Sequence, residues 1–233
     1  MAARDGLVQS AIDLVRRNGV AGTGVTQLLE HSGISRRTIY LNFPGGKSEL
    51  ITEATRVAGR AMTTLIETFG RGGKPDTTVS SFTDSWKQVV ESSDFLAGCP
   101  VVAAALGRSE SAEAADAAGT AFDDWEQALA TRLRAEHIAP ETALSLATTV
   151  IAAIEGAVVM SLAKRSAEPL DRVGRHLTEL IRAHTPARQV TDTDRPTADP
   201  DSDQVAPPPG TSREDWGRKS TGMPDRSVGS VMR

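Results

Sequence analysis

The chain of 233 residues has few of the residue types that build disulfide, metal or catalytic sites. Its single cysteine, Cys99, can form neither an internal disulfide nor a cysteine-based zinc site. The four histidines show no metal-ligand spacing with one another or with Cys99: His31, His137, His176 and His184. The sequence also contains no recognisable nucleophile–base pair or phosphate-binding loop. We therefore expect no metal site, no cofactor and no enzymatic activity.

The chain also lacks a strong net charge, which is −4 with the histidines neutral. The charge is unevenly spread, however. Residues 1–60 carry eight lysines or arginines and five acidic residues, a net charge of +3, so the remaining residues carry −7. A basic N-terminal part on an acidic body suits a protein that contacts a polyanion with one end.

The N-terminal residues lack the apolar core and cleavage site of a signal peptide, so we expect a cytoplasmic protein. Residues 144–163 are long enough to cross a bilayer and contain one charged residue, Glu155. Because a glutamate in the middle of a span is costly in lipid, we expect a buried or interface helix there and no membrane partner.

Apolar residues recur at helical spacing through most of the chain, and no run alternates as a strand would. The fold predicted is all-α. Gly19 and the Pro44-Gly45-Gly46 turn end helices, and Ser35 and Ser48 are candidate N-caps. The helices expected are 7–18, 25–31, 35–43, 48–69, 78–92, 100–108, 111–136, 140–165 and 168–184.

Residues 190–233 contain six of the twelve prolines and only scattered apolar residues. Such a segment cannot bury enough surface to offset its chain entropy, so we expect it to be disordered. We therefore expect the folded part of the chain to end near residue 187 and a disordered tail to follow at 188–233.

The most informative segment runs from Thr23 to Lys47 and reads TGVTQLLEHSGISRRTIYLNFPGGK. A short helix, a turn at Gly33 and a second short helix from Ser35 match a helix-turn-helix, whose second helix enters the DNA major groove. Five apolar residues would fix the two helices to the first: Leu28, Leu29, Ile34, Ile39 and Phe43. Arg36 and Arg37 at the start of the second helix can reach guanine edges or phosphates.

This segment closely resembles the TetR/AcrR family of bacterial transcriptional regulators in its turn glycine, capping serine, Thr-Ile-Tyr run, Phe43 and Lys47. The sequences Gly98–Ala103 and Glu155–Ala157 are similar to the regulatory domain of the LmrA/YxaF-type subgroup. The resemblance implies that Arg36 and Arg37 meet base edges. It implies that six further residues bind the phosphate and sugar backbone: Thr26, Ser35, Thr38, Tyr40, Asn42 and Lys47. Gly24 and Asn42 depart from the residues common in the family, which leaves the backbone contacts less defined.

The body of the protein holds the candidate effector-binding residues: Phe82, Trp86, Phe95, Cys99, Phe122, Trp125, Glu155 and Met160. For the five aromatic residues and Met160, a core position is at least as much expected as a ligand contact. Cys99 has no identifiable neighbouring base, so a small packed hydrophobe is expected there rather than a reactive thiol. Glu155 is a candidate buried acid, which would pair across a dimer interface or hold a polar group of an effector. The apolar faces of 140–165 and 168–184 indicate a homodimer through these helices, as the resemblance also implies.

The expected function is therefore a homodimeric, ligand-responsive regulator that binds double-stranded DNA, more specifically a repressor released from a palindromic operator by a small, largely apolar effector. A DNA-binding regulator that responds to no effector is the alternative. The domains expected are a helix-turn-helix DNA-binding domain at 1–54, an effector-binding and dimerisation domain at 55–187, and the disordered tail at 188–233. The sequence leaves open the operator, the regulated genes, the effector, whether regulation is repression or activation, and the role of the tail.

Overall fold

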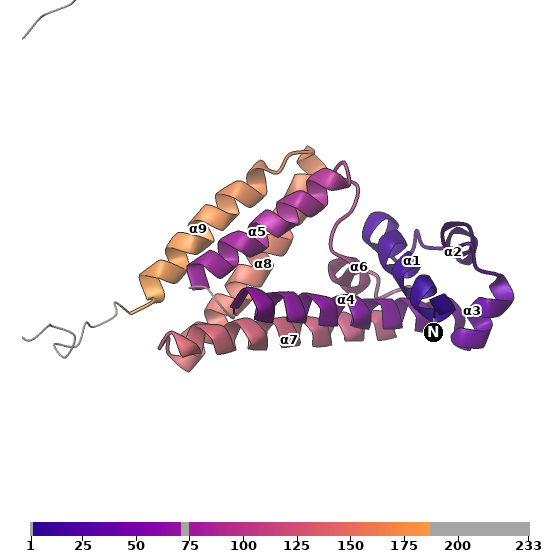
Figure 1. The fold of residues 1–233 in the computed structure, drawn as a ribbon, viewed down its shortest axis with the longest axis horizontal. Helices are drawn as coiled ribbons and strands as arrows, with labels where there is room; N and C mark the ends of the chain where they lie inside the picture. Colours follow the sequence, from indigo (N-terminus) through magenta and orange to yellow (C-terminus); the bar gives the residue numbers. More distant parts are fainter. Residues whose placement is uncertain (1, 71–74, 187–233) are drawn as a thin grey trace, which may run out of the picture. The chain divides into compact units, whose positions relative to one another are not determined.

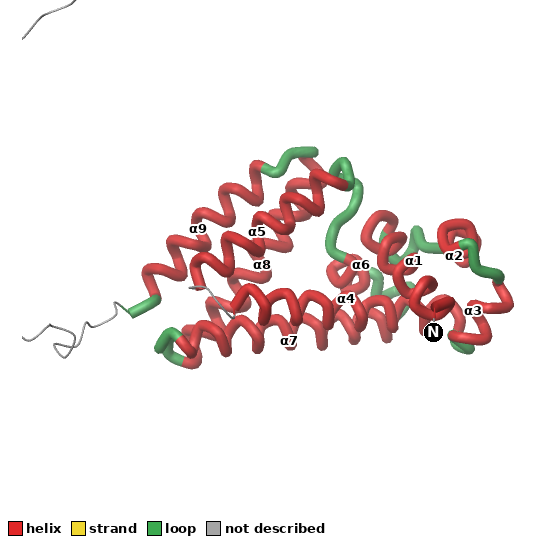
Figure 2. The backbone as a smooth tube through the Cα atoms, viewed as in Figure 1, coloured by secondary structure: helices red, strands yellow, loops and turns green. Residues whose placement is uncertain are grey.

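The computed structural model describes residues 2–70 and 75–186, and these residues form helices and no strands (Figure 2). The expected all-α class is confirmed. In chain order the helices are α1 (Ala2–Asn18), α2 (Val25–Ser32), α3 (Arg36–Asn42), α4 (Gly46–Gly70), α5 (Pro75–Ser92), α6 (Pro100–Leu106), α7 (Ala112–Ala135), α8 (Pro140–Lys164) and α9 (Glu168–His184). The tail expected at 188–233 and residues 71–74 lie outside the described residues.

Helices α1, α2 and α3 pack around a small hydrophobic cluster that the first turns of α4 complete (Figure 1). Leu28, Ile39 and Phe43 are almost fully buried in it, and Leu29 and Ile34 pack against it. The predicted anchoring of the two short helices to α1 is confirmed. Burial of these apolar side chains holds α3, only seven residues long, in a helix that would be unstable by itself.

Capping residues fix where several helices start and end. Gly33 ends α2 in the left-handed conformation, with φ of 67°, and Ser35 caps α3 by accepting the Thr38 N–H at 3.2 Å. The expected cap of α4 at Ser48 is wrong, because α4 begins two residues earlier at Gly46. The Ser48 hydroxyl instead pairs with that of Ser111, the N-cap of α7, at 2.8 Å.

Helices α4 and α7 run side by side along the body (Figure 1). Gly59 permits this close approach, because a Cβ atom there would come within 2.7 Å of the Ala121 Cβ. One helix turn further along α7, the indole N–H of Trp125 donates to the Gly59 carbonyl at 3.0 Å. The contact between the two helices therefore combines a small residue with a buried hydrogen bond.

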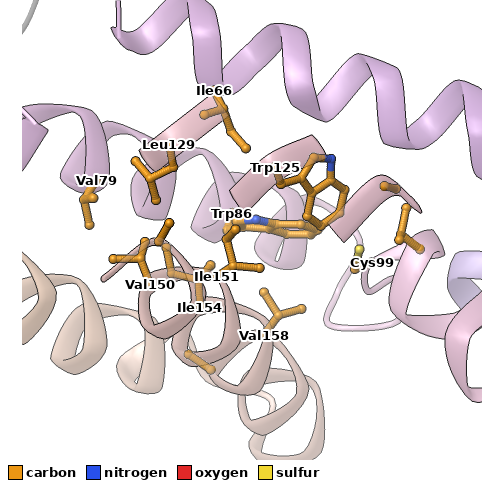
Figure 3. Packing of buried hydrophobic residues seen from close by; sticks show 14 of the residues in the cluster. Ile66, Val79, Trp86, Cys99, Trp125, Leu129, Val150, Ile151, Ile154 and Val158 are labelled. Atoms are coloured by element: carbon orange, nitrogen blue, oxygen red, sulfur yellow. The ribbon is translucent and has the colours of Figure 1, made fainter. Parts of the chain in front are cut away.

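The larger hydrophobic cluster fills the space between α4, α5, α7, α8 and α9 (Figure 3). Helix α8 contributes side chains four residues apart, Leu146, Val150, Ile154 and Val158, which face the cluster together. By length and composition α8 would also pass as a membrane span, but it packs here against α7 and α9. It still leaves Leu144, Val159 and Met160 39–52% exposed.

The smaller cluster is formed by the N-terminal helices and the larger one mainly by the later helices, but α1 and α4 contribute to both. Leu50 belongs to the smaller cluster and its neighbour Ile51 to the larger one. Helix α4 is continuous across position 54, and the described residues form one compact unit. The boundary between domains 1–54 and 55–187 therefore remains a prediction.

Candidate nucleic-acid interface

The side chains of α3 divide into an inner and an outer set. Ile39 is fully buried, as is Phe43 just beyond the end of the helix, while Arg36 and Arg37 are exposed. The structure contains no hydrogen bond or ion pair from either guanidinium to any of its described residues. Two arginines in this state keep all their N–H donors free for an external acceptor.

The polar residues of α3 are largely engaged in stabilising the helix. The Ser35 and Thr38 hydroxyls pair at 2.9 Å, and the Asn42 amide donates to the Thr38 carbonyl at 2.9 Å. Asn42 is half-buried, so one N–H of its amide is spent inside the helix. These three residues therefore support the helix that carries the arginines, besides any contact of their own.

Tyr40 and Lys47 lie where α3 meets the start of α4. Tyr40 is 46% exposed, and its ring packs over Gly46, where an added Cβ would come within 3.2 Å of the ring carbon Cε1. Lys47 is half-buried in the first turn of α4 and has no ion-pair partner in the described chain. The Gly45 N–H donates to the Glu49 carboxylate at 2.7 Å. Because Glu49 occupies this donor, one N–H group fewer is available there to bind an anion.

The entrance to α2 shows how the chain accommodates Gly24. The Gly24 N–H donates to the Gln27 side-chain carbonyl at 2.6 Å, which stabilises the first turn without a capping hydroxyl. Thr26 is exposed in the same turn. Other basic residues nearby are already paired: Arg4 and Arg60 both approach the Glu53 carboxylate, at 3.4 and 3.7 Å.

The eight candidate effector residues do not form one site. Trp86, Trp125 and Cys99 lie together in the larger cluster, as Figure 3 shows. The remaining aromatic candidates pack at its edge, where the Phe122 and Trp125 rings meet edge to face at 5.2 Å. Met160 is 48% exposed on α8, so it does not lie within this core.

Glu155 and Cys99 form a polar pair in this apolar surrounding. The Cys99 thiol lies close enough to the Glu155 carboxylate to affect its pKa, and the Glu155 Oε2 atom is buried without a hydrogen-bond partner. Burial raises the pKa of Glu155 from 4.5 to about 7, although the thiol contact opposes the rise. Burial likewise raises the pKa of the Cys99 thiol well above its usual value, the nearby Glu155 charge adding to the effect. Cys99 is therefore a packed neutral residue, as the sequence indicated.

Open grooves lie elsewhere on the body. One of about 460 Å³ runs between α5 and α9 and is lined mainly by polar residues such as Asp76, Thr83 and Arg175. A second of similar volume runs between α4 and α7. Neither is lined by a candidate effector residue. Within the residues described, no group of histidine, cysteine or acidic side chains could hold a metal ion.

Comparison with known proteins places this architecture among transcriptional regulators. Residues 75–176 match the family described as "Transcriptional regulator LmrA/YxaF-like, C-terminal domain". An HTH-type transcriptional regulator of Mycobacterium tuberculosis is 34% identical over 191 residues, which are 79% of this chain and 97% of that protein. The HTH-type transcriptional regulator LmrA of Bacillus subtilis is 25% identical over 182 residues, 77% of this chain and 97% of LmrA.

Solved structures agree with this result. A TetR transcriptional regulator from Chloroflexus aurantiacus is 25% identical with a TM-score of 0.66, over 78% of this chain and 94% of that one. The regulatory protein TetR from Rhodobacter sphaeroides shares the fold with a TM-score of 0.70 at 16% identity, over 77% and 98% of the two chains. This chain belongs to the TetR family of helix-turn-helix transcriptional regulators, in its LmrA/YxaF-like group.

Proposed function

We propose that this protein is a cytoplasmic, homodimeric repressor that leaves a palindromic operator when a small, largely apolar effector binds. The observation that carries the proposal is the state of α3. Its inner residues are fixed in a buried cluster, while Arg36 and Arg37 are exposed and unpaired in the described structure. A rigid helix with free guanidinium groups suits readout of guanine edges in the major groove.

In this proposal Arg36 and Arg37 contact base edges. The phosphate and sugar backbone is bound by Thr26, Ser35, Thr38, Tyr40, Asn42 and Lys47. The exposure of Tyr40 and its fixed position over Gly46 support a contact of its hydroxyl with a phosphate. Phosphate contacts set the register of the protein on the duplex, and base contacts set the sequence preference.

The surface of α8 supports a dimer. Leu144, Val159 and Met160 leave apolar area exposed on this helix. The sequence also indicated an apolar face on 168–184 for the dimer. That face is largely covered within the single chain, because Leu170 and Ile181 of α9 are buried there. In the dimer that we propose, α8 therefore supplies most of the apolar contact and α9 the polar rim. Twofold symmetry then predicts a palindromic operator.

The buried core supports an effector site near α5, α7 and α8. The Trp86 indole N–H and the Glu155 Oε2 atom are both buried without hydrogen-bond partners. Buried polar atoms usually have partners, so a molecule that enters here and bonds to them would gain affinity. The core also reaches the DNA-binding helices, since the Gly98 N–H beside Cys99 donates to the Arg16 carbonyl of α1 at 2.9 Å. An effector would release the protein from DNA only if it binds the DNA-free arrangement of these helices more tightly than the DNA-bound arrangement.

DNA binding is tested by selecting duplexes from a random pool with the full chain, followed by fluorescence anisotropy on the selected sequence. We expect Arg36→Ala and Arg37→Ala each to weaken specific binding by about 1–3 kcal/mol. Arg134→Ala, an exposed arginine near the end of α7, is the matched control and should bind like the native protein. Unchanged specific binding in both α3 variants would contradict the assignment of base contacts.

The effector is tested separately, with a panel of small aromatic and aliphatic compounds. A compound that binds the folded protein raises its melting temperature by mass action. We expect such a compound also to release the protein from the selected duplex. If compounds bind without changing DNA affinity, or none binds at all, the regulator that responds to no effector is the better description.

A further inference from the structure

Leu41 occupies the outermost position of α3. Ile39 and Phe43 are buried, and on an α-helix position 41 lies opposite the midpoint of those two positions. Leu41 is accordingly 70% exposed, more than Tyr40 beside it. Arg37 lies one turn earlier on the same face, four residues away. The centre of the face that α3 turns away from the protein is therefore an apolar side chain next to a guanidinium group.

Leu41 has no evident role in folding. It belongs to neither hydrophobic cluster and is not among the partly buried residues that pack against them. A single exposed leucine is common on protein surfaces and would need no explanation elsewhere. On this face, however, Leu41 lies next to an arginine that has no ion pair in the described chain. The helix that carries both residues is fixed by its cap and its buried residues. Leu41 therefore lies at the centre of an exposed face on a helix that is held in place, beside guanidinium groups that have no partner in the described chain.

The chemistry of the major groove identifies what Leu41 would meet there. Base edges in this groove are hydrogen-bond donors and acceptors, except for the C5-methyl group of thymine. An apolar side chain loses its water favourably only against an apolar group. We propose that Leu41 contacts a thymine C5-methyl group and makes the operator half-site prefer thymine near the guanine that Arg37 reads. This inference depends on the proposed DNA binding by α3.

The test removes the methyl group without changing the base pairing. Each thymine of the selected half-site is replaced in turn by uracil, and the dissociation constant of the full chain is measured for each duplex. We expect the native protein to lose affinity at one position by about fourfold, the factor for burial of one methyl-sized apolar group. Leu41→Ala should bind the thymine and uracil duplexes equally at that position, whereas Leu41→Met should keep the preference.

A second arm presents the methyl group on another base. At the same position, a 5-methylcytosine–guanine pair should bind the native protein more tightly than a cytosine–guanine pair, and Leu41→Ala should not distinguish them. Equal binding of thymine and uracil duplexes by the native protein, or an unchanged ratio in Leu41→Ala, would overturn the role of Leu41 alone. If no duplex is selected at all, both this inference and the proposed DNA binding fail. Because Leu41 is exposed, the variants should have the same melting temperature as the native protein.

Discussion

Trp86 and Trp125 lie in the same hydrophobic cluster, but their indole N–H groups differ. That of Trp125 donates to the Gly59 carbonyl, whereas that of Trp86 is buried without a partner. We expect Trp125→Phe to lower the free energy of unfolding by about 1 kcal/mol more than Trp86→Phe, the net value of one hydrogen bond. Urea unfolding of the two variants measures the difference. Equal losses would show that the bond to Gly59 contributes nothing.

Glu155 makes the stability of the fold depend on pH. Its pKa is about 7 in the folded chain, against an ordinary value of 4.5, because burial disfavours the carboxylate. Between these values the folded state binds more protons than the unfolded state, so the free energy of unfolding falls as the pH rises through this window. Above the folded pKa the loss is complete. Glu155→Gln should remove this part of the pH dependence.

The measurement for Glu155 is a set of urea unfolding curves from about pH 5 to about pH 8, a range that covers the window. The native protein should lose stability relative to Glu155→Gln as the pH rises. A constant difference between the two proteins over this range would mean that the folded chain does not raise the pKa of this carboxyl. A difference that grows in the opposite direction would mean that the carboxylate is stabilised.

At the scale of helices, two glycines differ in whether the packing around them leaves room for a side chain. A Cβ atom at Gly59 of α4 would come within 2.7 Å of Ala121 on α7, whereas one at Gly119 of α7 would have no atom within 4 Å. We expect Gly59→Ala to destabilise the fold by about 1–3 kcal/mol through overpacking. Gly119→Ala should stabilise it by about 0.5–1 kcal/mol, since alanine favours a helix. Thermal unfolding of both variants compares them, and a stabilised Gly59→Ala protein would contradict the close contact of α4 with α7.

The helices themselves were predictable because their signals are local. Gly33 marks the end of one helix through its backbone conformation and Ser35 marks the start of the next through its side chain, and the structure bears both out. The start of α4 was not predictable in this way. Ser48 has the chemistry of a cap, but the turn before it lets the helix begin at Gly46, with φ of 69°.

For the whole molecule, the proposed dimer surface on α8 has a direct test. Val159→Glu and Met160→Glu each put a charge on apolar area that is about half exposed in the single chain. If this area is covered in a dimer, burial of the charge is unfavourable and the variants should be monomers. Leu106→Glu is the matched control, because Leu106 is 81% exposed on α6 and lies outside this surface. Sedimentation velocity distinguishes the two states, and dimeric α8 variants would exclude this surface.

Long-range packing set the limit of what the sequence could predict. The helix-turn-helix residues lie in one continuous segment, so their grouping followed from chain order. The contact of Cys99 with Glu155 and that of Trp125 with Gly59 join residues more than 50 positions apart, and depend on how α4, α6, α7 and α8 pack. Likewise the apolar stripe of α9 showed that one face is buried, but not whether the same chain or a partner covers it.

In the dimer that we propose, two copies of α3 read base edges in the major groove of one duplex. Methylation interference at guanine N7, an atom of the major groove, tests it most directly. We expect two clusters of interfering guanines related by twofold symmetry, with centres about 34 Å apart or a multiple of that distance. Arg37→Ala should lose the interference at one guanine of each cluster. A single cluster, or a pattern that Arg36→Ala and Arg37→Ala both leave unchanged, would contradict the claim.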